Sequence, residues 1–272
     1  MGETFFTVDS GPDGDWFAPT EHARGPWDAR ACHAGPPTGL LARAVETAAP
    51  GHRLTRLTVE LIRPVPLAGF RISATVVRSG RVVASTRAEL VDQNATVCAY
   101  AHGTHVVSSS EPVLRQSFGP DDESPPRLAD ATPGTFPITR SAHDLPGFCT
   151  DGSVEVAYPV GQDQAPGPTT LWMRTIALLP DETPSPFQRI CPLADCGNAF
   201  SRYAEPWVTQ FLNADLTIYL HRDPVGHWLG SKVTADWHPN GVGISDALLF
   251  DEQGTVGRAM QTLVLRRAAA PA

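Results

Sequence analysis

The feature that most constrains the fold is a repeat, because the chain of 272 residues follows one plan twice at a spacing of 159 residues. Identity between the halves is low, so a single matched pair carries little weight. The spacing nevertheless holds from a predicted helix to the last predicted strand, which is typical of an internal duplication. We therefore expect two similar folding units. The matched pairs are Glu46 and Glu205, Leu57 and Leu216, Arg63 and Arg222, Asp92 and Asp251, and Thr96 and Thr255.

In the first half, the pattern predicts a helix over 37–47 followed by four strands. Leu40, Leu41, Ala44 and Val45 recur at helical spacing. Pro and Gly at 50–51 end this helix. The strands that follow alternate apolar and polar residues and are separated by turn residues, as in an antiparallel meander. They are predicted over 53–63, 70–78, 82–91 and 96–107.

In the second half, a central helix is predicted over 194–205, opening on Asp195 as its N-cap. Small or apolar residues fall on one helical face of this stretch. A helix followed by several strands is an α+β arrangement, in which the helix lies on a sheet. Present twice, it gives two sheets that can pair edge to edge. The strands are predicted over 154–160, 170–179, 212–221, 228–237, 243–250 and 256–266.

The domain boundaries follow from a change in composition between the halves. Residues 111–146 are rich in Pro, Asp, Ser and Gly and have no sustained period, which is typical of a linker. We expect an N-terminal unit over 1–110 and a C-terminal unit over 147–272.

Charge and cysteine content narrow the classes of function. The net charge of −8 argues against nucleic acid and anionic membrane as main partners. The first residues are acidic, unlike a secretory signal, and no apolar run reaches the roughly 20 residues of a membrane span. We therefore expect a cytoplasmic protein that binds no membrane. The five cysteines are an odd number without C-x-x-C spacing, which favours buried free thiols.

Polar residues that occur in only one half point to a single functional site. Taken alone, each has an ordinary interpretation: a helix cap, a residue at a strand start, or a solvated residue of an edge strand. Together they differ from their repeat partners, which indicates one working site and one degenerate copy. At a spacing of 159, Asp195 falls on Pro36, Asn213 on Leu54, and Gln261 on His102.

Three segments of the second half carry a family resemblance: 193–195, 212–222 and 256–261. With them the chain resembles the acyl-CoA thioesterase II family, proteins of two fused hotdog domains in which a sheet wraps a long helix. The resemblance implies an α+β double hotdog over nearly the whole chain. The family carries an aspartate, a threonine or serine, and a glutamine at these places. Asp195 and Gln261 match, whereas Asn213 departs from the usual hydroxyl.

The resemblance implies hydrolysis of an acyl-CoA thioester without a metal or cofactor. Asp195 would act as general base or orient a water, and Asn213 and Gln261 would hold that water. Backbone N–H groups at a helix entrance, near Gly35 or Gly197, would stabilise the oxyanion.

We also have expectations about which residues contact the substrate and about how the chains assemble. Arg63, Arg222, Arg266 and Arg267 are candidates for the CoA phosphates. The expected acyl pocket is lined by Trp27, Phe148, Trp172, Phe200 and Tyr203. The family resemblance also implies association into homo-oligomers. The acyl group, a role in lipid or natural-product metabolism, and a carrier-protein thioester in place of CoA stay open.

Two alternatives remain at this point. The first is hydration or dehydration of an enoyl thioester, for which Asp28 and His33 offer an acid and an imidazole five residues apart. Under that alternative activity depends on His33 rather than on Asp195. The second is a double hotdog that binds acyl thioesters without turning them over, which the replacement of the hydroxyl by Asn213 favours. Cys32, beside His33, is a weaker candidate for a nucleophile.

Overall fold

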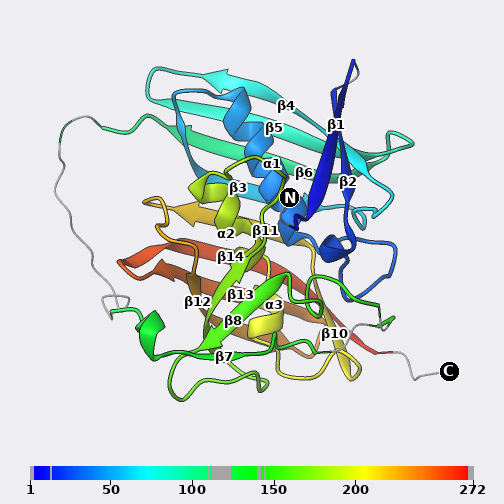
Figure 1. The fold of residues 1–272 in the computed structure, drawn as a ribbon, viewed down its shortest axis with the longest axis vertical. Coiled ribbons are helices and arrows are strands. Elements are labelled where there is room, and N and C mark those ends of the chain that lie inside the picture. Colours follow the sequence, from blue (N-terminus) through cyan, green and yellow to red (C-terminus); the bar gives the residue numbers. More distant parts are fainter. Residues whose placement is uncertain are drawn as a thin grey trace.

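The computed structural model describes residues 3–12, 14–109, 111, 124–139, 142–143 and 145–268. Within these residues, strands from both halves form one continuous sheet (Figure 1). The first half contributes strands in the order β1-β2-β4-β5-β6-β3. Their bounds are β1 Phe6–Gly11, β2 Gly14–Pro19, β3 Arg53–Leu61, β4 Phe70–Ser79, β5 Val83–Asp92 and β6 Val97–Val106.

The second half continues the sheet in the order β11-β14-β13-β12-β9-β8-β7, with β10 paired to β14. The halves meet where β3 and β11 pair antiparallel, with Thr58 opposite Thr217. The predicted α+β double hotdog with a joined sheet is thus confirmed. The bounds are β7 Thr132–Gly134, β8 Val154–Tyr158, β9 Thr169–Thr175, β10 Thr209–Asn213, β11 Asp215–Leu220, β12 Leu229–His238, β13 Val242–Asp251 and β14 Gly254–Arg267.

The sequence repeat is present in three dimensions, with one slip. β12 and β13 begin and end 159 residues after β4 and β5. In the last strand the spacing falls to 158, because Ser245 pairs with Gln261 whereas its counterpart Thr86 pairs with Gly103. Three residues lie between Asp92 and Thr96, which bond through the backbone, whereas two lie between Asp251 and Gly254. Gln261 therefore corresponds to Gly103, and the predicted match of Gln261 with His102 is wrong by one position.

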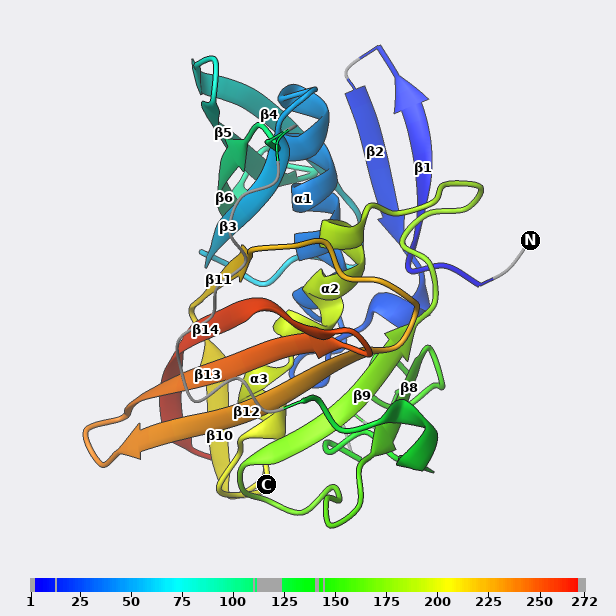
Figure 2. The same ribbon diagram turned by 90° about the vertical axis from the view of Figure 1, so that its left-hand side faces the viewer.

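Helix α1, Gly35–Ala48, confirms the predicted first helix and packs on the sheet formed by β3 to β6 (Figure 2). There are also two short 3-10 turns, η1 (Glu21–Ala23), whose Ala23 is buried in the core, and η3 (Leu128–Asp130). The second helix differs from the prediction. Helix α2 spans Pro186–Ala194, and a single turn, α3, spans Gly197–Phe200. Asp195 therefore ends α2 rather than opening a helix.

Capping explains where the second helix starts and stops. The Ser185 side chain accepts a hydrogen bond from the Gln188 amide, and Pro186 is preset for the first turn, so α2 begins there. After α3, the buried Arg202 side chain donates to the Ala199 and Gln164 carbonyls. The bond to Ala199 satisfies a backbone carbonyl that the end of α3 leaves without an intrahelical partner. Glu205 precedes a proline, which disfavours further helix.

Part of the expected linker is folded within the second half. Residues 112–123 lie outside the described residues, but β7 pairs with β8 at the sheet edge. Phe136 and Ile138 are buried in the main core. All five cysteines are free, as the sequence predicted. Among the described residues, no helix has the length and apolar character needed to cross a membrane.

Candidate active site

The site is centred on Asp195, in the break between α2 and α3. The residue is 2% exposed. Its Oδ1 accepts a hydrogen bond from Nδ2 of Asn213 at 2.8 Å. Its Oδ2 lies 3.1 Å from Nδ1 of His33, a residue of the first half. The buried carboxylate is therefore held from two sides, by one predicted partner and by an imidazole from the other repeat.

Gln261 joins the site through the backbone. Its Nε2 donates to the carbonyl of Asp195 at 2.9 Å, and its Oε1 accepts from the amide of Asn198 at 2.9 Å. The glutamine side chain thus bridges the break between α2 and α3 and satisfies polar groups that the broken helix leaves open. Gly197 gives it room, since a Cβ there would lie 2.9 Å from Oε1 of Gln261. The three residues predicted from sequence meet, but Gln261 does not contact the carboxylate.

Asn213 is placed by an irregularity in the edge strand. It ends β10, and β11 begins two residues later at Asp215. Across this break, the Asp215 carboxylate accepts hydrogen bonds from the amide and hydroxyl of Thr262 on β14. The break turns Asn213 toward Asp195 while the strand stays attached to the sheet.

Asn198 is a site residue that the sequence reasoning missed. Its Nδ2 donates to the Phe211 carbonyl at 3.1 Å and lies 3.5 Å from Oδ1 of Asn213. In the sequence it sits among small residues of an expected helix, where it reads as one polar position of that helix. Its separation of three residues from Asp195 was the available signal.

His33 is held firmly beside the carboxylate. Its ring stacks on Phe148 with centroids 4.0 Å apart and an interplanar angle of 16°. Nδ1 accepts a hydrogen bond from the backbone N–H of Gly35 at 3.2 Å and lies 3.1 Å from Asp195 Oδ2. Asp28, the acid of the enoyl-thioester alternative, lines the same cavity as His33, and its carboxylate bonds to Arg30. His33 and Asp195 thus lie in one site, and the predicted contrast, in which loss of activity follows one residue or the other, stays a prediction.

A cavity of about 270 Å³ opens beside these residues. His33, Asp195, Asn198 and Asn213 form its polar wall, and Trp27 packs edge-to-face on Phe211 beside it. The remaining wall is mostly apolar, with Arg63 among the lining residues. A mostly apolar cleft with a few convergent polar groups is typical of a small-molecule site. Apolar lining residues include Leu61, Ile62, Val65, Ile138, Ala199 and Leu212.

Four of the five predicted pocket residues lie outside this cavity. Trp172 is on the opposite face of the sheet, where it packs on Phe250, because side chains alternate along a strand. Tyr203 is 51% exposed, since the helix expected to carry it inward ends at Phe200. Phe200 is buried against Phe136. Phe148 stacks on the His33 ring. Of the five predicted pocket residues, Trp27 is the one that lines the cavity.

Two of the predicted basic residues have structural partners. Both terminal nitrogens of Arg222 bond the buried Asp251 carboxylate at 2.6 Å, and Arg222 also caps nearby carbonyls. Hydrogen bonds from Arg222 and backbone amides lower the pKa of Asp251 against the opposing effect of burial. Arg63 donates to the Val97 carbonyl and also lines the cavity. Arg266 and Arg267 lie on β14 opposite the start of β10.

The predicted oxyanion glycines line the helix break rather than the cavity. The Gly35 amide faces His33 Nδ1, and prolines at 36 and 37 have no N–H to offer. Cys32 lines the cavity, but burial raises the pKa of its thiol far above the usual range. A thiol in that environment stays protonated and is a poor nucleophile.

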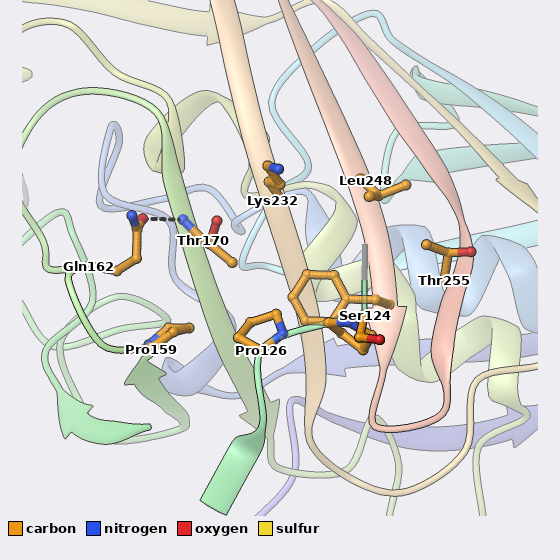
Figure 3. Close-up of a pocket in the computed structure, with 10 residues that line it drawn as sticks. Ser124, Pro126, Pro159, Gln162, Thr170, Lys232, Leu248 and Thr255 are labelled. Carbon is orange, nitrogen blue, oxygen red and sulfur yellow. Dashed lines mark hydrogen bonds between the residues drawn. The ribbon is translucent and has the colours of Figure 1, made fainter. Parts of the chain in front are cut away.

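A second cavity, of about 280 Å³, lies over the opposite face of the sheet (Figure 3). Lys232 and Leu248 line it from β12 and β13, and Thr170 donates its amide to Oε1 of Gln162 beside it. It contains none of the predicted catalytic residues.

Family models match both halves of the chain. A model described as the acyl-CoA thioesterase N-terminal domain matches residues 23–106. A model described as the acyl-CoA thioesterase C-terminal domain matches residues 120–265, more than half of the chain. A comparison with the sequences of curated proteins finds no match.

Solved structures share the fold over nearly the full length. A proposed thioesterase II from Thermobifida fusca YX has 15% identity and a TM-score of 0.72, covering 93% of this chain and 92% of its own. A protein of unknown function with a hot dog fold, from Alicyclobacillus acidocaldarius, has 17% identity and a TM-score of 0.72, with 95% and 94% covered. Acyl-CoA thioesterase II from Mycobacterium marinum has 17% identity and a TM-score of 0.57, with 89% and 92% covered.

At these identities the solved structures establish the fold alone, and the family is established by the two matched models. Both models describe the family that the sequence motifs resemble. The chain belongs to the acyl-CoA thioesterase family, thioester hydrolases built here as a double hotdog.

Proposed function

We propose that this protein hydrolyses an acyl-CoA thioester to the free acid and CoA at the cavity beside Asp195. One observation carries the proposal: a buried carboxylate, fixed by an amide from the next strand, forms the polar wall of a mostly apolar cavity. Hydrolysis needs a water made more nucleophilic and held near the carbonyl carbon. A fixed negative charge at the end of an apolar cleft supports that chemistry.

The three residues predicted from sequence have different roles in this proposal. Asp195 supplies the negative charge that draws a proton from the attacking water. Asn213 fixes the carboxylate by donating to Oδ1. Gln261 is a positioning residue, because both ends of its amide bind backbone groups on either side of Asp195. A backbone N–H at Gly35 or Gly197 as the oxyanion donor stays a prediction.

The size and lining of the cavity support a model in which the acyl group lies inside it and the CoA part lies outside. About 270 Å³ is near the lower end of ligand cavities and suits an acyl group rather than a whole CoA. The apolar side chains would contact the acyl chain, and the pantetheine arm would leave past Arg63. Arg63 is then the first candidate for a phosphate contact.

Domain division, assembly and location are part of the same proposal. The division into units over 1–110 and 147–272, joined by a linker over 111–146, stays a prediction, and the C-terminal family match begins at residue 120, inside that linker. Association into homo-oligomers and a cytoplasmic location remain predictions of the sequence.

A thiol-release screen over linear, branched and aromatic acyl-CoAs tests the function. Asp195→Asn keeps the shape of the side chain and removes its charge, so the proposal requires a loss of most activity with the fold intact. Asp236→Asn changes an exposed carboxylate on β12 and serves as a matched control that should stay active. Wild-type activity in Asp195→Asn contradicts the assignment. Acyl carrier protein thioesters in the same screen decide between the two carriers.

A further inference from the structure

The backbone determines which nitrogen of His33 carries the ring proton. Nδ1 accepts a hydrogen bond at 3.2 Å from the N–H of Gly35, the first residue of α1. A nitrogen of a neutral imidazole that accepts a hydrogen bond carries the lone pair, so the proton is on Nε2. The 3.1 Å approach of Asp195 Oδ2 to Nδ1 lacks the geometry of a hydrogen bond and requires no proton there. His33 is therefore a donor at Nε2.

This donor is open to the cavity. The Nε2–H group has no hydrogen-bond acceptor among the described residues, and Nε2 is not among the buried polar atoms that lack a partner. The His33 ring lines the cavity, and its side chain is 11% exposed. Stacking on Phe148 holds the plane of the ring. The cavity beside Asp195 thus contains an N–H donor that is fixed in place and has no protein acceptor.

Other amide donors near this place are engaged or absent. The N–H of Gly35 is committed to His33, and the prolines at 36 and 37 have no N–H. The side-chain amides of Asn198 and Asn213, which also line the cavity, already donate to protein groups. The backbone donor that the sequence predicts near Gly35 is therefore replaced by the donor that its N–H positions.

We propose that the Nε2–H of His33 donates to the thioester carbonyl oxygen and stabilises the oxyanion that forms there. The inference rests on the proposed hydrolysis with Asp195 as the base. A donor held in place where charge develops, in a mostly apolar site, is an effective stabiliser of a transition state. A neutral imidazole whose other nitrogen accepts from a helix start is suited to polarise a carbonyl. Arg63 is exposed, which suits a phosphate rather than a carbonyl inside the cavity.

The proposed step balances without another reactant. The water oxygen forms a bond to the carbonyl carbon, its proton passes to Asp195, and the π electrons move to the oxygen that His33 contacts. The tetrahedral intermediate then re-forms the C=O bond and breaks the C–S bond. The proton on Asp195 passes to the thiolate sulfur of CoA. The products are the carboxylic acid and the free thiol, and the proton of His33 stays on Nε2 throughout.

Two amide substitutions separate a donor from a base. The amide of a glutamine reaches the position of Nε2 and can donate there, whereas that of an asparagine reaches only the position of Nδ1. We expect kcat to fall by roughly 10²- to 10³-fold in His33→Asn, with little change in KM. His33→Gln should keep a clearly higher kcat than His33→Asn. A base at this position would leave both variants equally slow, because an amide takes up no proton.

Two further variants serve as controls. His33→Phe keeps a flat ring beside Phe148 but has no donor, so it should be as slow as His33→Asn if the donor rather than the ring matters. The matched control is His22, whose Nδ1 lies 2.7 Å from Oδ2 of Asp151 and which does not line the cavity. His22→Asn should keep the wild-type kcat and KM.

The infrared stretch of a bound carbonyl reports the hydrogen bond without turnover. The probe is an acyl-CoA analogue with CH₂ in place of the thioester sulfur and an isotope-labelled carbonyl, which cannot be hydrolysed. In the wild-type protein the carbonyl stretch should lie below its value in water, because a strong donor weakens the C=O bond. His33→Asn should remove this shift, and His33→Gln should keep part of it.

The outcomes separate the two proposals. If His33→Asn keeps the wild-type kcat, or if His33→Gln is as slow as His33→Asn, the donor role is overturned and the hydrolase function stands. If the wild-type protein releases no thiol from any acyl-CoA, both proposals fall. Should no His33 variant fold, a carbonyl stretch in the wild-type protein at or above its value in water also overturns the donor role.

Discussion

Thr58 and Thr217 stand 159 residues apart in the chain, and their hydroxyl oxygens lie 3.1 Å from each other. They are equivalent positions of the two repeats and pair directly where β3 meets β11. An antiparallel pairing of equivalent residues is what a local two-fold axis produces. The spacing found in the sequence is therefore also the register of the junction between the halves.

This junction predicts non-additive stability effects. Thr58→Val or Thr217→Val removes one partner of the same hydrogen bond, so each should lower the free energy of unfolding by about 1 kcal/mol. The double variant should lose hardly more than either single variant. Urea unfolding of the four proteins measures this, and strict additivity would contradict a shared bond.

Asn213→Leu installs the residue that the first half has at the corresponding position, Leu54. It removes the donor to Asp195 Oδ1 and leaves a buried charge with one partner fewer. A hydrogen bond to a charged group contributes about 1.5–3 kcal/mol. We expect a loss of about ten- to a hundredfold in kcat/KM for thiol release. Asn213→Thr, which restores a hydroxyl donor, should lose less, and equal losses would argue against the hydrogen bond.

Gln261→Leu should affect both stability and activity. The amide of Asn198 and the carbonyl of Asp195 would each lose a buried partner, at about 1–3 kcal/mol for each unsatisfied group. Thermal unfolding and thiol release measure the two effects. Met260→Leu is the control, because Met260 is the strand neighbour whose side chain is 46% exposed on the other face. A Gln261→Leu protein with wild-type melting temperature and activity would contradict the bracing role.

His105 predicts a pH dependence of stability that is separate from catalysis. It is fully buried, its Nε2 contacts the Thr86 hydroxyl at 2.8 Å, and its Nδ1 has no hydrogen-bond partner among the described residues. Burial, with a smaller effect of His52, lowers its pKa below the ordinary value of 6.5. On acidification the unfolded chain takes up this proton first, so the free energy of unfolding falls as pH drops through and below 6.5.

The matched variant for this test is His105→Leu. Leu263 holds the equivalent place in the second half, opposite Asn213 as His105 is opposite Leu54. Urea unfolding between pH 5 and pH 7.5 should show a smaller loss of stability on acidification in the variant than in the wild type. An unchanged slope would show that His105 does not contribute.

By itself the sequence determined the duplicated layout, the strands, and two residues that meet directly, Asp195 and Asn213. These follow from local patterns, since apolar alternation and turn residues act over a few positions. Only the tertiary structure decided where the second helix breaks, because Gln261 from β14 and the buried Arg202 satisfy the freed backbone groups. It also decided the one-residue slip in the last strand and the approach of His33 to Asp195. Such contacts depend on the packing of the two halves, which no local spacing in the chain encodes.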